Sequence, residues 1–340
     1  MIGRLVARAC STASSTSVQS IFHPTVYMSG LQATGIPHLG NYYGLIKPWC
    51  SLQNDLHSSE VSFFLCIADM HSLSLGPQPP QEIRSNIYHM AACLIACGVD
   101  PKKTILFRQS AIPEIPQLSW MLSSLQTVSK LQRLPQYKDK SQEYARSGVP
   151  LGLLSYPVLQ AADVMALKAT HVPIGKDQSQ HMNLLTDLAL SWNTAYNTQL
   201  FPVPQAVFPH HARVKSLRNP QKKMSKSERG ERGRIHVIDS EEQIIDKCKK
   251  AQSDSISEIT YDTGRRTAVA NLIDLLAAVR ETTAEEVMKE ASQWDTITLK
   301  DTLASDIETV VERILREGEE KAREVVVKTV QEALVIAGFR

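Results

Sequence analysis

The sequence of 340 residues lacks several features that would place a protein in a structural class at once. None of its six cysteines forms a C-x-x-C pair, so neither a structural zinc site nor a disulfide framework is indicated, and a reducing compartment fits. No apolar run has the length needed to cross a bilayer, so a membrane span is not expected. The formal net charge is only +2, so a nucleic-acid partner would require a local basic face.

Acidic residues are absent from the start of the chain, where none precedes Asp55. Arg4 and Arg8 lie beside a short apolar stretch, and a run rich in serine and threonine follows them. A basic, serine-rich and acid-free start is typical of a mitochondrial presequence, and an ordinary disordered terminus is the alternative. We therefore expect residues 1–21 to direct the chain to the mitochondrial matrix, and the folded part to begin near Phe22.

The order of local patterns indicates an α/β fold over the first part of the chain. Runs of β-prone residues alternate with helical spacing at 25–28, 40–56, 61–68, 80–98 and 103–108. Ser29-Gly30 should close the first strand, and Pro48 should bend or locally open the helix that follows. Such alternation predicts a Rossmann-like parallel sheet, with ligands at the carboxyl ends of its strands.

After about residue 235 the pattern becomes helical. Capping boxes at Ser240 and Thr283 begin helices, residues 267–280 are apolar at helical period, and 304–336 suggests two long helices. Because the chain exceeds the usual size of a single core, more than one folded domain is expected. We expect a catalytic domain over 22–235, an all-α domain over 236–325 and, over 326–340, a helix end that could pack back on the catalytic domain.

A loop after the first strand carries the motif Pro37-His38-Leu39-Gly40-Asn41. Glycine allows a planar base or ribose to approach the backbone closely, and His38 and Asn41 can form hydrogen bonds to a nucleotide. The helix that begins there would point free amides at a phosphate. We interpret the motif as one side of a nucleotide site, with a surface loop as the alternative.

A second motif, Lys223-Met224-Ser225-Lys226-Ser227, lies far downstream. Hydroxyls and amides between lysines suit the capture of phosphate oxygens, while the ammonium groups neutralise charge. A solvated basic loop is the alternative. We expect Lys223 and Lys226 to stabilise a departing pyrophosphate, and Gly230 and Gly233 to let the loop open and close.

Between the two motifs, an apolar run at 153–162 leads into Asp163. The run should be buried, so the carboxylate of Asp163 requires a partner. A helix cap or a buried ion pair would supply one from the protein itself, and a bound ligand would supply one from outside. A further polar segment at 175–181 follows at a second junction between a strand and a helix.

These motifs and their order resemble the class I aminoacyl-tRNA synthetases, and the segments around Asp163 and 175–181 are similar to those of the bacterial-type tryptophanyl-tRNA synthetases. The resemblance extends from Val26 to Arg340, and residues 212–217 are more similar to mitochondrial members. It implies that ATP, with Mg²⁺, activates L-tryptophan, which is then transferred to the 2′-hydroxyl at the end of tRNA(Trp) for mitochondrial protein synthesis. It also implies a homodimer and an anticodon-binding helical domain. Tyrosyl-tRNA synthetase, an inactive RNA-binding paralogue and a small-cofactor adenylyltransferase are the alternatives.

The resemblance also implies which residues form the site, and no protein-bound metal is among them. Asp163 would accept the indole N–H of tryptophan. The implied catalytic residues are His38, Asn41, Lys223 and Lys226. The implied ATP contacts are Gln32, Ala33, Thr34, Gly40, Asn41, Lys140, Gly175, Lys176, Asp177, Val214, Lys223, Met224, Ser225, Lys226 and Ser227. The implied tryptophan contacts are Met28, His71, Tyr156, Gln160, Asp163 and Gln178.

Some positions depart from the pattern of the resemblance. Family members often have glutamate where Lys176 stands, and Gln160 replaces an apolar residue, so it could either contact tryptophan or line the wall. Lys138 is an alternative to Lys140 as the lysine that reaches the triphosphate. In the helical part, Arg265 and Arg266 are candidates for contact with tRNA phosphates, with solvated surface as the alternative.

Overall fold

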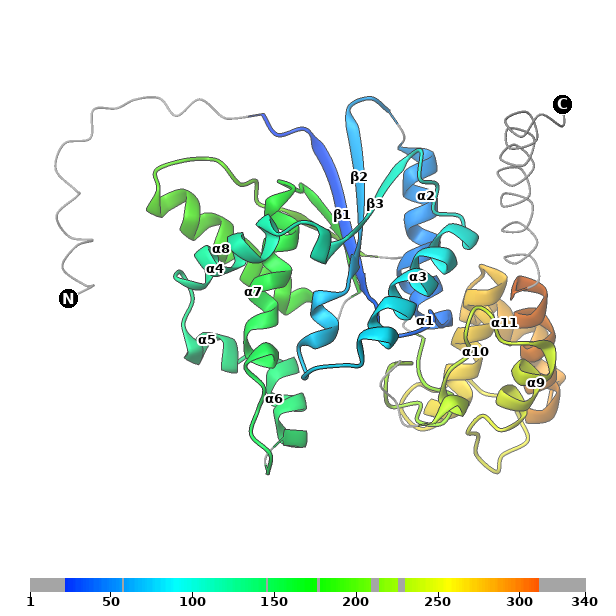
Figure 1. The fold of residues 1–340 in the computed structure, drawn as a ribbon. Coiled ribbons are helices and arrows are strands. Elements are labelled where there is room, and N and C mark those ends of the chain that lie inside the picture. The colour runs from blue at the N-terminus through cyan, green and yellow to red at the C-terminus, as the bar shows by residue number, and fades with distance from the viewer. Residues whose placement is uncertain are drawn as a thin grey trace, which may run out of the picture.

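The computed structural model describes residues 22–56, 58–144, 146–175, 178–208, 214–225 and 230–311. Its centre is a five-stranded parallel sheet with the order β3-β2-β1-β4-β5 (Figure 1), which confirms the predicted Rossmann-like α/β fold. The strand order reverses between β1 and β4, and open sheets of this kind bind ligands at such a point. The strands are β1 (Thr25–Gln32), β2 (Val61–Ala68), β3 (Thr104–Arg108), β4 (His171–Pro173) and β5 (Gln205–Val207).

The first strand is longer than its sequence suggests. The prediction that Ser29-Gly30 closes it is wrong, because β1 continues to Gln32 and Gly30 lies opposite Cys66 of β2. A Cβ at Gly30 would lie 3.3 Å from the carbonyl oxygen of Cys66, so this glycine allows close packing inside the sheet. The hydroxyl of Ser29 donates to the carbonyl of Pro173 at 2.7 Å and fastens β1 to β4.

Helices cover both faces of the sheet, and the side chains of β1 alternate between two hydrophobic clusters. Tyr27 and Leu31 belong to the cluster that includes side chains of α2 and α3, whereas Val26 and Met28 belong to the cluster that includes those of α4, α7 and α8. Figure 1 shows these two sets of helices on opposite sides of the strands. Their bounds are α2 (Lys47–Asp55), α3 (Pro80–Ala96), α4 (Glu114–Ser123), α5 (Val128–Gln132), α6 (Pro135–Ser141), α7 (Leu151–Ala166) and α8 (Ser179–Ala195).

Pro48 opens its helix, as predicted. The segment comprises α1 (Leu39–Asn41), a π-helical turn (Tyr42–Ile46) and α2. The Lys47 N–H donates to the carbonyl of Tyr42, five residues earlier, directly before Pro48. Because the proline ring would crowd the carbonyl four residues before it and has no N–H to donate, a wider turn at this point relieves the contact.

Beyond residue 237 the regular secondary structure of the described chain is helical, as expected. The helices are α9 (Glu241–Lys249), α10 (Thr267–Arg280), α11 (Ala284–Glu290) and a helix over residues 296–311. Both predicted capping boxes are present, at Ser240 and Thr283. The helix expected from residue 304 already begins at 296, and its continuation beyond 311 lies outside the described residues. Within the described ranges, no helix combines the length and apolar character that crossing a membrane requires.

The helical part shares its hydrophobic core with one face of the sheet. A single buried cluster runs from Tyr27 and Trp49 through Ile244 to Leu272 and Ile307. At the surface, Lys47 of α2 pairs with Glu281, which follows α10, at 2.5 Å. The helical part therefore lies on the side of the sheet that α2 and α3 cover, as Figure 1 shows.

Candidate functional site

His38 and Asn41 of the first motif form two reciprocal hydrogen bonds. His38 is the N-cap of α1, and its Nδ1 accepts from the Asn41 N–H at 3.3 Å, while the Asn41 side-chain oxygen accepts from the His38 N–H at 3.2 Å. His38 is 2% exposed. The Leu39 N–H donates to the carbonyl of Ile235 at 2.9 Å. The amides of Leu39 and Asn41 are thus paired within the chain, so the predicted binding of a phosphate by helix amides would not use these two.

The second motif is one side of a small antiparallel ribbon. Lys223 lies opposite Lys215, the Met224 N–H donates to the Val214 carbonyl at 3.1 Å, and the Ser216 N–H donates to the Lys222 carbonyl at 2.9 Å. The side chain of Met224 is buried, whereas Lys223 and Ser225 are partly exposed. The ribbon therefore fixes the backbone of the motif at Lys223.

The two motifs touch. A Cβ built on Gly40 would lie 2.9 Å from Cε1 of His38 and 3.5 Å from the Cβ of Met224. The segment that follows the lysine motif also returns to the first one, since the Val237 N–H donates to the Pro37 carbonyl at 3.1 Å. Segments that are far apart in the sequence thus form one structure next to the carboxyl end of β1, as the nucleotide-site interpretation requires.

Asp163 lies inside α7 and is 4% exposed. His71, which follows β2, approaches one carboxylate oxygen with its Nε2 at 2.9 Å, and the amide of Gln109, which follows β3, donates to the other at 2.7 Å. Of the two protein-supplied partners left open by the sequence, the structure shows a buried side-chain pair, and Asp163 is not a helix cap.

Four further side chains, those of Tyr156, His181, Gln178 and Gln160, extend this polar cluster. The Tyr156 hydroxyl is 3.3 Å from Nε2 of His181, and Nδ1 of His181 is 2.6 Å from the side-chain oxygen of Gln178. The amide of Gln160 reaches the same oxygen at 3.5 Å. The ring of Tyr156 also meets that of His71 edge-on, at 6.2 Å between centroids. Burial raises the pKa of Tyr156 to about 12, so its hydroxyl remains a neutral donor.

Comparison with known proteins places this arrangement in a family. A family model described as class I tRNA synthetases (W and Y) matches residues 22–312. The chain belongs to this family. The mitochondrial tryptophan–tRNA ligase of Caenorhabditis elegans is 49% identical over 334 residues, which cover 93% of this chain and 92% of the relative.

Two solved structures extend the comparison. The tryptophanyl-tRNA synthetase of Mycoplasma pneumoniae aligns with a TM-score of 0.78 and 29% identity over 91% of this chain and 92% of its own. The enzyme of Campylobacter jejuni, in a complex with ADP and tryptophan, aligns with a TM-score of 0.63 and 27% identity over 92% of this chain and 100% of its own.

Two buried polar residues of the synthetase, Gln109 and Asp69, received no role in the sequence-based assignment. Gln109 is fully buried, and while its amide donates to Asp163, its oxygen accepts from the Met70 N–H at 3.2 Å. Asp69 is buried and accepts from the Met70 N–H at 3.0 Å and from the Ser110 N–H at 2.9 Å. Both directly follow strands of a parallel sheet, and this position was the signal that could have identified them.

Some of the remaining predicted residues lie at the carboxyl ends of β1 and β4, and others lie elsewhere. Gln32 ends β1, Ala33 and Thr34 follow it, and Gly175 follows β4. Lys138 and Lys140 are exposed on α6, which Figure 1 shows on the side where β1 ends. Met28 is buried in the core and Val214 in the ribbon. Four predicted ATP contacts, Lys176, Asp177, Lys226 and Ser227, lie outside the described residues.

Arg266 has a structural role, so the prediction that it contacts tRNA phosphates is wrong. Its guanidinium is buried and donates to both carboxylate oxygens of Asp254, at 2.8 and 2.6 Å, and to the carbonyls of Ile256 and Glu258. The hydrogen bond between them raises the pKa of Arg266 and lowers that of Asp254. Arg265 is exposed, and its contact with RNA stays a prediction.

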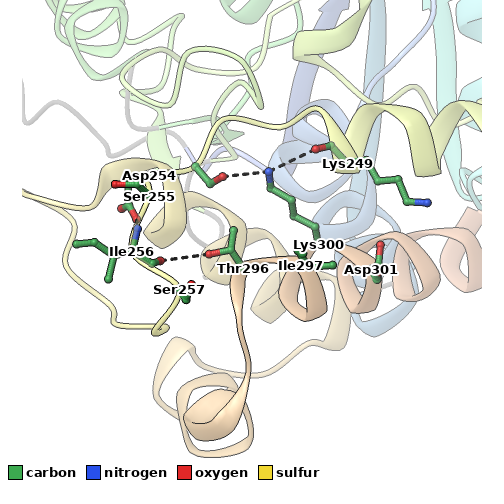
Figure 2. Close-up of a pocket in the computed structure, with 10 residues that line it drawn as sticks. Lys249, Asp254, Ser255, Ile256, Ser257, Thr296, Ile297, Lys300 and Asp301 are labelled. Atoms are coloured by element: carbon green, nitrogen blue, oxygen red, sulfur yellow. Dashed lines mark hydrogen bonds between the residues drawn. The ribbon is translucent and has the colours of Figure 1, made fainter.

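The helical part of the synthetase contains a cavity of about 470 Å³ (Figure 2). It lies between the loop at 253–257 and the start of the helix over 296–311, and none of the predicted site residues lines it. The ammonium group of Lys300 donates to the Ala251 carbonyl at 2.7 Å and the Ser253 hydroxyl at 3.1 Å. Burial lowers the pKa of Lys300, and the charge of Arg218 lowers it further.

Among the residues that the structure describes, no cluster of three or more potential metal ligands occurs.

The contact between the motifs yields a prediction for the synthetase. Gly40→Ala would displace the ring of His38, since the new methyl would lie 2.9 Å from its Cε1 and 3.0 Å from its Nδ1, whereas Met224 at 3.5 Å would be an ordinary contact. Overpacking of this kind costs about 1–3 kcal/mol, so kcat/KM for ATP in pyrophosphate exchange should fall roughly 10- to 100-fold. Gly44→Ala is the matched control, because a Cβ there meets no atom within 4 Å. Equal kinetics for both variants would contradict the packing argument.

Proposed function

We propose that the chain activates L-tryptophan with MgATP and transfers it to the 3′ end of tRNA(Trp) for mitochondrial protein synthesis. The observation that carries the proposal is the proximity of the two nucleotide motifs, since a Cβ built on Gly40 would lie 3.5 Å from the Cβ of Met224. The three similar proteins described above are all named for tryptophan, and this supports the choice of amino acid. The mitochondrial name of the C. elegans relative supports the compartment.

The first step is attack of the tryptophan carboxylate on the α-phosphorus of ATP, in line with the bond to the leaving pyrophosphate. The carboxylate is already ionised at neutral pH, so no protein nucleophile or base is required, and positioning and charge neutralisation supply the catalysis. Lys223, with Lys226, neutralises the charge that grows on the pyrophosphate. In the second step, the 2′-hydroxyl of the terminal adenosine attacks the carbonyl of tryptophanyl-adenylate, and AMP leaves.

Asp163 reads the indole in this proposal. Tryptophan has a single side-chain donor, the indole N–H, and each oxygen of a carboxylate can accept more than one hydrogen bond. His71 and Gln109 each occupy one site on the carboxylate and hold it in place. Asp163 thus keeps acceptor capacity for the substrate, while Tyr156, Gln160, Gln178 and Met28 form the surrounding pocket.

The proposed contacts with ATP come from the loops after the strands and from the ribbon of the lysine motif. Asn41 and His38 shape the loop over the nucleotide, and Mg²⁺ enters as part of the ATP substrate. The proposed ATP contacts are Gln32, Ala33, Thr34, Gly40, Asn41, Lys140, Gly175, Lys176, Asp177, Val214, Lys223, Met224, Ser225, Lys226 and Ser227.

ATP–pyrophosphate exchange with a panel of amino acids tests the function. Exchange that depends on tryptophan alone is the expected result. Exchange with tyrosine alone would instead identify a tyrosyl-tRNA synthetase. RNA binding without exchange under any amino acid would identify an inactive paralogue.

We also propose that the two domains have different functions: residues 22–235 carry out catalysis, and residues 236–325 recognise the anticodon. Residues 1–21 would direct the chain to the mitochondrial matrix, and 326–340 would end the last helix; both lie outside the described residues. Fusing 1–21 to a fluorescent protein tests the targeting, since a fusion that stays outside mitochondria would contradict it.

A homodimer is the remaining part of the proposal. Large apolar side chains are exposed in the described structure, among them Trp120 of α4, which is 82% exposed, and Ile105 of the edge strand β3. A second copy of the chain would cover such side chains. Sedimentation velocity should show a dimer that Trp120→Glu dissociates, and a monomeric parent protein would refute this.

A further inference from the structure

One buried amide in the helical part reaches across to the ribbon of the lysine motif. Asn271 of α10 is 1% exposed in a helix whose other buried residues are apolar. Its side-chain oxygen accepts from the Lys215 N–H at 3.2 Å, and its amide nitrogen donates to the carbonyls of Ser216 and Lys215, at 3.2 and 3.4 Å. A buried amide is tolerated only when it is paired, so this position depends on the backbone of residues 215 and 216.

The backbone of residues 215 and 216 has two neighbours. Asn271 lies on one side of it, and the lysine motif pairs with it on the other side. Lys215 lies directly opposite Lys223, and Ser216 donates its N–H to the Lys222 carbonyl. Asn271 is therefore separated from Lys223 by a single strand. Any shift of residues 215 and 216 away from α10 would move the backbone of Lys223 with them.

Other contacts from the helical part fasten the same segment. The Gln252 N–H, after α9, donates to the Leu217 carbonyl at 2.7 Å. The side chain of Gln221 donates to the Thr267 hydroxyl, at the start of α10, at 3.1 Å. Of these contacts, only those of Asn271 are side-chain bonds in a fully buried position, where hydrogen bonds are strongest and loss of a partner costs most.

We propose that Asn271 is a positioning residue for amino-acid activation: by pairing with Lys215 and Ser216 it sets where Lys223 meets the triphosphate. The helical part thereby supports the catalytic lysine as well as any RNA contact. The inference rests on the proposed role of Lys223 and goes beyond it, because it makes a residue outside the catalytic domain necessary for the first chemical step.

The experiment measures pyrophosphate exchange by the full chain carrying Asn271→Ala, which leaves the two carbonyls and the N–H without their partner. Small displacements of a catalytic group cost up to about 100-fold, so we expect kcat to fall roughly 10- to 100-fold. The dissociation constant for tryptophan, measured by equilibrium dialysis without ATP, should stay unchanged. Hydrogen exchange at the Lys215 amide should become faster.

Tyr261→Phe is the matched control, because it removes a hydrogen bond of 2.7 Å to Asp274 of the same helix, and this bond joins two residues outside the ribbon. It should retain the parent kcat. If Asn271→Ala does not fold, Asn271→Ser and the more exposed Thr267→Val carry the same test, and a smaller fall in kcat is expected from Thr267→Val. A folded Asn271 variant with normal kcat, or a weakened tryptophan affinity with unchanged kcat, would overturn the inference.

The outcome for Lys223 separates this inference from the proposed function. If Lys223→Ala retains full exchange activity, the proposed role of the lysine motif fails, whatever the Asn271 variants do. If Lys223→Ala is inactive while the Asn271 variants are fully active, only the positioning role of Asn271 is refuted.

Discussion

Lys223→Ala should lower the kcat of tryptophan-dependent pyrophosphate exchange by roughly 100-fold or more, the usual effect of removing one group that neutralises transition-state charge. The charge on the pyrophosphate oxygens grows as the bond to the α-phosphorus breaks, so the ammonium group acts more strongly in the transition state than on bound ATP. The fall should therefore appear in kcat, with little change in the affinity for tryptophan. Initial rates over a matrix of ATP and tryptophan concentrations measure both.

Lys222→Ala is the control for Lys223→Ala. Lys222 is adjacent and exposed, and its contact in the ribbon is made by its carbonyl, which the substitution leaves in place. The control removes the same charge from the same turn without moving the backbone. If both variants lose activity equally, general attraction of ATP explains the effect, and the specific role of Lys223 is wrong.

Asp163→Asn should raise the KM for tryptophan and reduce the preference for tryptophan over phenylalanine. The substitution keeps the shape of the side chain but places an amide where the indole N–H meets a carboxylate oxygen. An unmatched buried hydrogen-bond partner costs about 1.5–3 kcal/mol, which is roughly a 10- to 100-fold change in discrimination. Pyrophosphate exchange with each amino acid gives the two values of kcat/KM.

Asp187→Asn provides the matched control for Asp163→Asn. Asp187 pairs with Lys130 at 2.9 Å on the surface, and a surface pair of this kind contributes only about 0–1 kcal/mol. Its removal should alter neither discrimination nor stability. Asp163→Asn should also lower the melting temperature, because His71 and Gln109 lose a buried partner. Unchanged discrimination between tryptophan and phenylalanine in a folded Asp163→Asn variant would refute its recognition of the indole.

Local features of the fold could be predicted because they depend on residues close together in the chain. The strand at 61–68 and the capping boxes at Ser240 and Thr283 follow from patterns a few residues long. The opening of the helix before Pro48 likewise has a local cause, because the proline has a bulky ring and lacks an N–H donor. The predicted end of the first strand was wrong because it depends on a residue distant in the chain: Gly30 packs against Cys66 of the neighbouring strand.

The chemical type of the site was also accessible from the sequence, but its hydrogen-bond partners were not. A buried carboxylate at Asp163 had to be paired, yet whether a helix end, another side chain or a substrate paired it depended on which strand ends met. Arg266 shows the same dependence on tertiary structure. Its carboxylate partner, Asp254, is close in the sequence, but the fold buries the guanidinium of Arg266 and makes it inaccessible to RNA.

The sequence by itself determined the types of most elements, the order of the two nucleotide motifs and the need of Asp163 for a partner. Periodicity, caps and the cost of burying a charge act on each segment independently of the rest of the chain. Only the tertiary structure decided that Gly40 meets Met224, that His71 and Gln109 hold Asp163, and that Asn271 holds the ribbon of Lys223. Such contacts join residues distant in the chain, and they exist only once the sheet order and the packing of α10 bring their backbones together.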